Sequence, residues 1–185
     1  MAAPDPYKIV IVGDGYVGKT CLLLSHITNE FPGGYAPTIF ENYSCQIEVD
    51  FKEYTLLLWD TSGQEIYSCI RTLCYPNTKC FIVCYAIDNR RSFENVRHKW
   101  VPEIRELTQS NNVSILVVAA KSDLRANNAT ECVTTMEGIS LCKEIKADCF
   151  VECSARSKRS NSVFVQAIRI IKRKECRKSS RCQIL

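Results

Sequence analysis

Residues 13–20 read Gly-Asp-Gly-Tyr-Val-Gly-Lys-Thr and fit the spacing G-x-x-x-x-G-K-[ST], which describes a loop that wraps nucleotide phosphates. Glycines let the backbone curl until successive N–H groups point inward and form a nest for phosphate oxygens. Lys19 would then reach the outer phosphates, and the hydroxyl of Thr20 is a hard oxygen that suits Mg²⁺. A helix beginning near Gly18 would direct its positive end to the same point. These residue types therefore predict phosphate binding.

The segments on both sides of this loop have the order that phosphate binding needs. Residues 7–12 form an apolar run that is rich in β-branched residues and ends at the first glycine, which is typical of a buried strand. Residues 21–24 follow with helical character. An incidental glycine turn between a strand and a helix is the alternative, but the order of strand, loop and helix favours a phosphate loop.

The length of the chain and its first residues narrow the class of protein. A chain of 185 residues is long enough for one domain with a substantial core. The first six residues contain neither a basic nor an apolar segment, so no signal peptide is expected, and Ala2 excludes N-myristoylation. Since no apolar run approaches the ~18 residues of a membrane helix, we expect a cytosolic globular protein.

Twelve cysteines are a high number for this length. A disulfide scaffold would need a secretory signal, which we do not expect here. No C-x-x-C pair is present, whereas Cys80/Cys84 and Cys149/Cys153 are four residues apart in strand-like runs, which places each pair on one face. We therefore expect most thiols to be reduced and buried as small apolar groups, and not to bind a metal.

Along the rest of the chain, strand-like and helix-like segments alternate. We expect a hairpin from residues 43–50 and 54–60, strands at 80–87, 113–120 and 149–153, and helices at 18–29, 92–109, 134–146 and 161–174. Two prolines and two glycines make residues 31–38 a mobile loop. This order implies an α/β fold in three layers, a mostly parallel six-stranded sheet with helices on both faces.

The remaining polar motifs fall beyond the carboxyl ends of the expected strands, where open α/β sheets bind their ligands. Asp60 ends an apolar strand and would be a Mg²⁺ partner through water. Gly63 offers an N–H group to a terminal phosphate, and Gln64 would orient an attacking water, although in isolation it would be a solvated loop residue. Residues 121–123 and 154–156 follow two further strands. Four loops are therefore expected to converge on one edge of the sheet.

Together these motifs resemble those of the Ras-like small GTPases. The matching residues are 13–20, Asp-Thr-Ser-Gly-Gln-Glu at 60–65, Lys-Ser-Asp at 121–123 and Ser-Ala at 154–155. The Rho family is indicated by residues 31–43, 73–78 and 152–155. Rho proteins usually carry a helical insert after the Lys-x-Asp loop, and residues 125–133 are too short for it. This shortening, with residues 133–138 and the Cys-Gln-Ile-Leu end, is similar to the insect Rho-like branch.

The resemblance implies a P-loop NTPase G domain over residues 1–175, followed by a basic tail over residues 176–185. It implies GTP or GDP as the bound nucleotide and Mg²⁺ as the cofactor, with Thr20, Thr38 and Asp60 (through water) at the metal. It implies that Lys19, Gly63 and Gln64 serve catalysis, an in-line attack by water helped by an activator's arginine. The implied nucleotide contacts are Gly13, Asp14, Gly15, Tyr16, Val17, Gly18, Lys19, Thr20, Cys21, Phe31, Tyr35, Thr38, Asp60, Gly63, Lys121, Asp123, Leu124, Ser154, Ala155 and Arg156.

The same resemblance implies how the base and the switches work. Asp123 would accept both guanine N–H donors in a bidentate, charge-assisted pairing that selects guanine over adenine. Lys121 and Phe31 would sandwich the base, and the Ala155 backbone would contact its carbonyl. Residues 31–43 and 62–76 would be switches that GTP orders and hydrolysis releases, with Thr38 reaching Mg²⁺ only when a γ-phosphate is present. The implied effector and switch residues are Tyr35, Thr38, Phe40, Tyr67 and Leu73.

Several positions depart from the family pattern. Ala120 replaces an Asn or Thr whose side chain ties the base loop to the phosphate loop, which predicts faster nucleotide release. Ser62 replaces an alanine beside the γ-phosphate, as in Rho members that hydrolyse GTP poorly. Tyr16 replaces a small residue, and its ring either obstructs an activator's arginine or points to solvent. Ile66 replaces an acid and makes the second switch more apolar, as a partner-binding surface would be.

The C-terminal end carries a different set of signals. Cys182-Gln-Ile-Leu is a C-a-a-X box whose leucine predicts geranylgeranylation of Cys182. One lipid gives marginal membrane binding, and residues 169–185 supply a second signal because their net charge is +6 in a chain of net charge +4. The remaining residues carry −2 and show no nucleic-acid footprint. Cys176 is a candidate for palmitoylation, a plain solvated cysteine being the alternative, and a solvated basic end with an accidental cysteine is the alternative for the whole tail.

The leading interpretation is therefore a membrane-anchored Rho-type GTPase switch at the cytoplasmic face of the plasma membrane, exchanging with the cytosol. By resemblance its partners would be an exchange factor, an activating protein, a GDP-dissociation inhibitor and effectors (kinases and actin regulators) that control the actin cytoskeleton, cell shape and migration. The second interpretation is a hydrolysis-poor or fast-exchanging, GTP-loaded scaffold, which Ser62 and Tyr16 favour and Gln64 disfavours. A small-molecule kinase with this phosphate loop would leave residues 121–123 unexplained.

Overall fold

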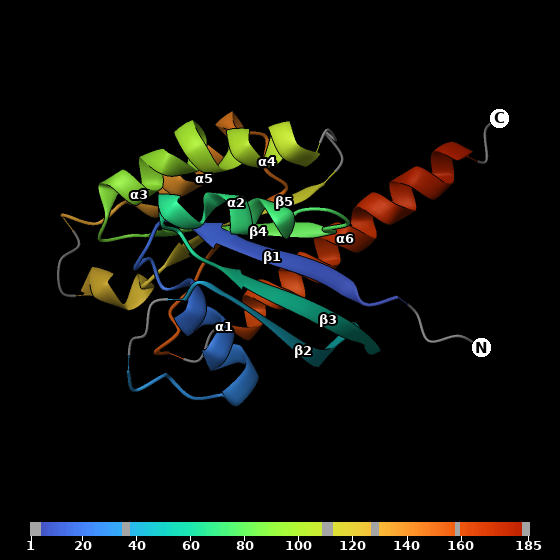
Figure 1. The fold of residues 1–185 in the computed structure, drawn as a ribbon, viewed down its shortest axis with the longest axis horizontal. Helices are drawn as coiled ribbons and strands as arrows, with labels where there is room; N and C mark the ends of the chain where they lie inside the picture. Colours follow the sequence, from blue (N-terminus) through green and yellow to red (C-terminus); the bar gives the residue numbers. More distant parts are fainter. Residues whose placement is uncertain (1–4, 35–37, 109–112, 127–129, 158–159, 183–185) are drawn as a thin grey trace.

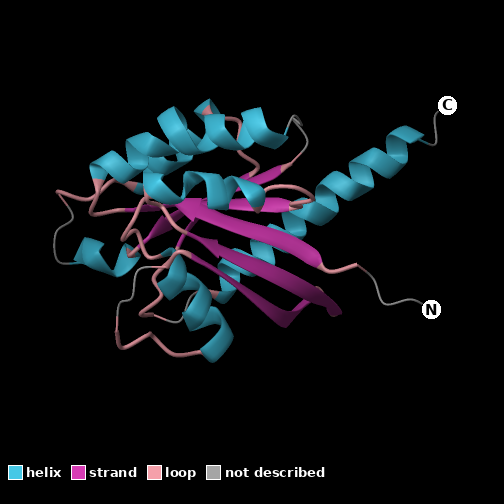
Figure 2. Ribbon diagram, in the orientation of Figure 1, coloured by secondary structure: helices cyan, strands magenta, loops and turns pink. Residues whose placement is uncertain are grey.

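The computed structural model contains one six-stranded sheet between two layers of helices (Figures 1 and 2). It describes residues 5–34, 38–108, 113–126, 130–157 and 160–182, with no side chains for 178–182. The strands are β1 (Tyr7–Gly13), β2 (Phe40–Val49), β3 (Lys52–Thr61), β4 (Cys80–Ala86), β5 (Ser114–Ala120) and β6 (Cys149–Glu152). They lie in the order β2-β3-β1-β4-β5-β6; β2 pairs antiparallel with β3, and the other neighbours pair in parallel. The predicted α/β class and sheet are confirmed.

The α-helices within the described ranges are α1 (Lys19–Thr28), α2 (Ser68–Leu73), α3 (Arg90–Asn95), α4 (Val101–Thr108), α5 (Thr135–Glu144) and α6 (Asn161–Cys182). Helices α1 and α6 pack on one face, and α3, α4 and α5 pack on the other (Figure 1). Successive side chains of β1 serve the two faces in turn: Ile9 and Ile11 join the α1/α6 core, and Val10 and Val12 join the opposite core. Burial on both faces explains why the strand is apolar without alternation.

The helix predicted over residues 92–109 extends over residues 90–108, but it is interrupted. A single π-helical turn, Val96–Trp100, separates α3 from α4, and the N–H of Val101 bonds to the carbonyl of Val96. Pro102 explains the wider turn, because a proline ring has no N–H and clashes with the carbonyl four residues earlier. Helical periodicity alone does not reveal this change.

The last helix is longer than predicted, because α6 continues past residue 174 to Cys182. The additional residues include Glu175, Arg177 and Lys178, which are good helix formers, and no glycine or proline interrupts them. A pair between Lys172 Nζ and Glu175 Oε2 at 2.9 Å supports this part of the helix. None of the helices within the described ranges is long and apolar enough to span a membrane. The other expected elements are present, with bounds shifted by a few residues.

The loop predicted over residues 31–38 is only partly described. Residues 31–34 and Thr38 lie outside helices and strands, whereas residues 35–37, and with them Tyr35, lie outside the described residues. The predicted hairpin is present, with Asp50 and Phe51 at its turn.

The described cysteine side chains differ in their exposure. The expected burial holds for Cys74, Cys80, Cys84, Cys132 and Cys153, whereas Cys69 and Cys176 are exposed and four others are half-buried. Burial raises the pKa of Cys153 to about 12, which keeps that thiol neutral.

His26 is a half-buried histidine between α1, α6 and β2. Its ring stacks on Phe164 with centroids 4.2 Å apart, and Nε2 lies 3.9 Å from Cys45 Sγ. Burial lowers the pKa of His26 below its ordinary value of 6.5, because the charged form is disfavoured in the core. The folded protein therefore binds fewer protons than the unfolded chain in the range below 6.5.

We expect this histidine to contribute to acid sensitivity. Since the unfolded state takes up the proton first, the contribution of His26 to stability is complete above pH 6.5 and is lost as the pH falls through the interval down to the lowered pKa. Thermal unfolding of the wild type and of His26→Phe, which keeps a stacking ring, should therefore diverge as the pH is lowered from 7.5 to 5.5 (about one unit on each side of the free pKa). A difference in melting temperature between the two proteins that stays constant over that pH range would contradict the expectation.

Candidate functional site

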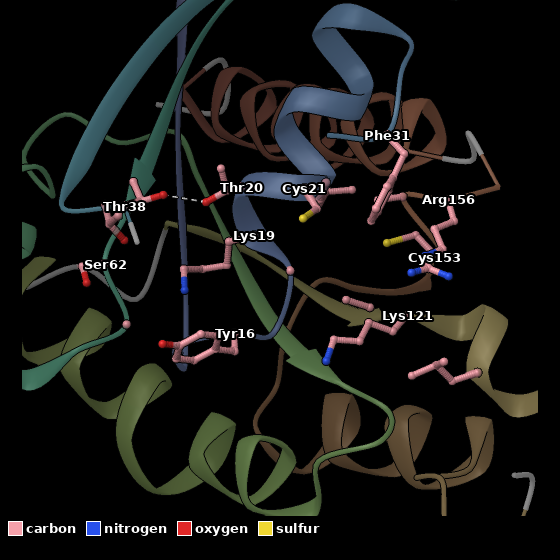
Figure 3. A pocket seen from close by; sticks show the side chains of 18 of the residues that line it. Tyr16, Lys19, Thr20, Cys21, Phe31, Thr38, Ser62, Lys121, Cys153 and Arg156 are labelled. Carbon is pink, nitrogen blue, oxygen red and sulfur yellow. Dashed lines mark hydrogen bonds between the residues drawn. The ribbon is translucent and has the colours of Figure 1, made fainter. Parts of the chain in front are cut away.

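A cavity of about 340 Å³ opens where the loops after β1, β3, β5 and β6 meet (Figure 3). This volume is within the range of small-molecule sites. The predicted contacts that line it are Gly15, Tyr16, Gly18, Lys19, Thr20, Cys21, Phe31, Thr38, Gly63, Lys121, Asp123, Leu124, Ala155 and Arg156. Leu22, Thr61, Ser62, Gln64, Ala120 and Cys153 line it as well. The expected convergence of four loops is therefore present.

Two glycines determine the shape of the phosphate end of the cavity. Gly13 has φ +144°, and a Cβ built on it would lie 2.2 Å from the carbonyl oxygen of Cys84. A Cβ on Gly63 would lie 2.3 Å from the carbonyl oxygen of Gly13 and 2.4 Å from the amide nitrogen of Gly15. The segment after β3 therefore packs directly on the backbone of residues 13–15, which only a residue without a side chain allows.

Lys19 crosses the same loop from the first turn of α1. Its Nζ donates to the carbonyl oxygens of Gly13 at 2.9 Å and Asp14 at 2.8 Å, and the side chain is buried. Burial lowers the pKa of Lys19, since a charged ammonium loses its hydration there. A phosphate group at the loop would supply the counter-charge that this buried ammonium needs.

Three oxygen-bearing side chains meet beside Lys19. Thr20 Oγ1 donates to Asp60 Oδ2 at 2.5 Å and lies 2.8 Å from Thr38 Oγ1. Asp60 Oδ1 is buried and has no hydrogen-bond partner among the described residues, and burial raises the pKa of this carboxyl. A buried carboxylate oxygen without a partner is costly unless a cation compensates it. Hydroxyl and carboxylate oxygens are also the ligands that Mg²⁺ prefers, so the residues present fit this metal.

The residues after β3 are held by a buried arginine of α2. Arg71 Nη1 donates to the carbonyl oxygens of Ser62 at 3.0 Å and Gln64 at 3.4 Å. The same guanidinium makes a bidentate pair with Glu103 of α4, Nε–Oε1 3.0 Å and Nη2–Oε2 2.8 Å. The Ser62 hydroxyl accepts from the N–H of Gln64 at 3.3 Å. The backbone of Gln64 is therefore fixed from two sides, and the residue lines the cavity.

The opposite end of the cavity combines a carboxylate with apolar and cationic groups. Ser154 Oγ donates to Asp123 Oδ1 at 2.6 Å, which orients the carboxylate. The Arg156 guanidinium lies 5.2 Å from the centre of the Phe31 ring, and Lys121 Nζ lies 3.2 Å from Asp88 Oδ2. Figure 3 shows Thr20 and Thr38 on one side of the cavity and Phe31, Arg156 and Lys121 on the other. This arrangement suits a flat base with N–H donors.

Some predicted contacts lie behind the cavity wall. Gly13, Asp14, Val17, Asp60 and Ser154 are not among its lining residues. The side chain of Val17 is fully buried in the α1/α6 core, so its predicted contact with a phosphate would come from its backbone N–H. The other four support residues that do line the cavity, through the contacts given above. Tyr35 lies outside the described residues.

The hydrogen bonds that connect Asp14 of the phosphate loop to residues 95 and 100 were not predicted from the sequence. Asp14 Oδ1 accepts from Trp100 Nε1 at 2.8 Å, and Asp14 Oδ2 accepts from Asn95 Nδ2 at 2.7 Å. Trp100 is fully buried against the sheet. The signal that could have found the link is chemical, since a buried indole N–H normally has an acceptor.

The predicted effector and switch residues have different exposures. Leu73 and Ile66 are 78% and 77% exposed, so the second switch does present apolar side chains. Phe40 is half-buried against Trp59, with ring centroids 5.1 Å apart, and Tyr67 is half-buried.

Comparison with known proteins agrees with this geometry. The model of the Ras family matches residues 8–173. The Ras-like GTP-binding protein RhoL of Drosophila melanogaster is 50% identical over 185 residues, which cover 99% of this chain and 96% of that protein. The chain therefore belongs to the Ras family of small GTPases, as its motifs predicted, and it is similar to a Rho-like member.

Proposed function

We propose that the protein is a membrane-anchored Rho-type switch that binds GTP or GDP with Mg²⁺, hydrolyses GTP and acts at the cytoplasmic face of the plasma membrane. The observation that carries the catalytic part is that Lys19, Thr20, Gln64 and Asp123 line one and the same cavity. Phosphate, metal, water and base each have a matching group there. The proposed outputs are effectors that control the actin cytoskeleton, cell shape and migration; the Rho-like resemblance is the support for these.

Base recognition depends on Asp123. Its carboxylate, oriented by Ser154, would accept two N–H donors of guanine, which adenine cannot offer in the same place. Phe31 and Lys121 line the same end of the cavity and would hold the two faces of the ring. Each accepted hydrogen bond to a charged group is worth about 1.5–3 kcal/mol, so this carboxylate decides the base specificity.

Hydrolysis depends on positioning and charge. The Gln64 amide would orient a water in line with the terminal phosphate, while Lys19 and the N–H of Gly63 would stabilise the charge that develops on the phosphate oxygens. Mg²⁺, which Thr20, Thr38 and (through water) Asp60 would hold, would neutralise phosphate charge when bound. Thr38 belongs to the first switch, so its contact with Thr20 would report the state of the nucleotide to the surface of the protein.

The membrane part of the proposal depends on the chain end. Cys182 is the proposed geranylgeranylation site, and Cys176, which is exposed, is a candidate for palmitoylation. The net charge of +6 over residues 169–185 would add attraction to anionic lipids. An exchange factor, an activating protein and a GDP-dissociation inhibitor are the proposed regulators.

A hydrolysis-poor, GTP-loaded scaffold is the second candidate, and one observation favours it. Tyr16 lines the cavity, has φ 64° and is 66% exposed, so its ring would obstruct an activator's arginine if it lies across the approach to the phosphates. Ser62, whose hydroxyl is engaged by the backbone of Gln64, changes the neighbourhood of the attacking water.

Single-turnover hydrolysis of bound GTP, with and without a Rho-family activating protein, decides between the two candidates. We expect strong acceleration by the activator, and slow hydrolysis in both conditions for Gln64→Leu, which removes the amide that orients water. Tyr16→Ala tests whether the tyrosine ring obstructs the activator. If the activator accelerates hydrolysis equally in the wild type and in this variant, the ring leaves the path of the arginine open. If the wild type leaves GTP intact under both conditions, the switch interpretation is wrong and the scaffold interpretation is favoured.

A further inference from the structure

Phe51 is the most exposed large apolar side chain described, and its backbone is unfavourable for it. The ring is 97% exposed at the turn between β2 and β3. Asp50 and Phe51 have φ values of 52° and 62°, which is the left-handed pair of a hairpin turn that normally takes glycine at its second position. An aromatic residue in this place neither packs in the core nor favours the turn. Its ring is therefore available to something outside the chain.

The turn is fastened to the last helix of the protein. Asp50 Oδ1 lies 2.7 Å from Arg169 Nη2 of α6. Beyond Arg169, α6 continues to Cys182, which places the proposed lipid site about 20 Å further along the helix at 1.5 Å per residue. Figure 1 shows the β2–β3 turn on the same side of the molecule as both chain ends. Since β3 starts at this turn and the cavity lies beyond its far end, the two features occupy opposite edges of the sheet.

The outer side of α6 carries the charge that an anionic surface would attract. Arg169, Arg173 and Arg177 recur every four residues, which places them along one side of the helix, and all three are exposed. Cys176 is exposed beside them. Acidic charge lies close to the turn, because Glu48 of β2 pairs with Glu53 of β3. This acidic pair would limit entry to the tip of the hairpin.

We propose that Phe51 is a second membrane anchor, which enters the headgroup region of an anionic bilayer while the arginine side of α6 lies along the lipid surface. An apolar phenylalanine ring gains by burial at the boundary between headgroups and acyl chains, and arginines contribute by attraction to anionic headgroups. With the lipid on Cys182, the protein would have two apolar contacts at the ends of a basic row, which fixes the orientation of its body. This inference rests on the proposed membrane attachment.

The first test measures partition of the geranylgeranylated, GDP-loaded full chain onto phosphatidylcholine vesicles with and without phosphatidylserine. We expect Phe51→Gly to weaken binding to the phosphatidylserine vesicles about five- to tenfold, from the loss of one partly buried aromatic ring. Glycine suits the turn, so this variant should fold and melt at or above the wild-type temperature. Met136→Ala, which removes a 68% exposed apolar side chain from α5, is the matched control and should bind like the wild type.

The second test locates the ring in the bilayer. Phe51→Trp should show fluorescence quenching by brominated phosphatidylcholine in phosphatidylserine vesicles, beyond any quenching of Trp59 and Trp100 in the unsubstituted protein. Normal vesicle binding by Phe51→Gly together with no additional quenching would overturn the inference, and would assign the ring to a protein partner instead. Wild-type protein that fails to bind any of these vesicles would refute the membrane attachment itself, which is a different outcome.

Discussion

Arg71→Met is expected to lower the free energy of unfolding by about 3–5 kcal/mol, the usual cost of breaking a buried ion pair from one side. Arg71 is buried, and methionine leaves Glu103 half-buried without its bidentate partner. Burial alone would raise the pKa of Glu103, and hydrogen bonds from Arg71 and Tyr75 hold it below its usual range. Chemical denaturation at neutral pH measures the loss.

The double variant Arg71→Met/Glu103→Leu distinguishes the effect of the ion pair on stability from the role of Arg71 in positioning Ser62 and Gln64. With both charges replaced by apolar groups, most of the lost stability should return, because the uncompensated carboxylate is gone. GTP hydrolysis should not return, since the carbonyls of Ser62 and Gln64 still lack the Arg71 donor. A single variant as stable as the wild type would show that the pair contributes nothing to folding. Full hydrolysis by the double variant would show that Gln64 is positioned by other contacts.

Ala120→Thr is expected to slow GDP release about ten- to hundredfold, which corresponds to one regained hydrogen bond of about 1–3 kcal/mol. Ala120 ends β5, is buried and lines the same cavity as residues of the phosphate loop and the base loop. Its methyl group cannot tie the two loops together, whereas a hydroxyl at the same place can. Release of a fluorescent GDP analogue measures the rate.

Ala120→Val is the matched control, because valine has the shape of threonine without the hydroxyl. If the hydrogen bond is what matters, valine should leave the release rate near that of the wild type. Equal slowing by both variants would assign the effect to filled space. Wild-type release as slow as that of other Rho proteins would remove the reason for the prediction.

The elements that bury one continuous apolar run were predictable from the sequence. Strand β1 was readable because four apolar residues precede Gly13, and the phosphate loop was readable because its glycines, lysine and threonine are adjacent in the chain. The hairpin was readable from two runs around a polar turn. In each case the determining contacts are local, so the pattern and the structure carry the same information.

Contacts between distant residues were not predictable. Arg71 and Glu103 are 32 residues apart, and Asp14 and Trp100 are 86 apart, so no local pattern relates them. The length of α6 was underestimated because its last turns leave the apolar periodicity that marked its beginning. The motif predicts a backbone contact for Val17, and it does not reveal that the side chain of this residue packs in the core.

The position of Trp100 connects nucleotide binding to partner binding. Its N–H bonds to Asp14 of the phosphate loop, and its ring lies 4.8 Å from the guanidinium of Arg71, which holds Ser62 and Gln64. One rigid indole therefore touches both the group that shapes the phosphate nest and the group that holds the second switch. Linkage between two binding events is reciprocal. A partner that favours one position of Arg71 would therefore change the affinity for the nucleotide by a certain factor. The nucleotide would change the affinity for that partner by the same factor.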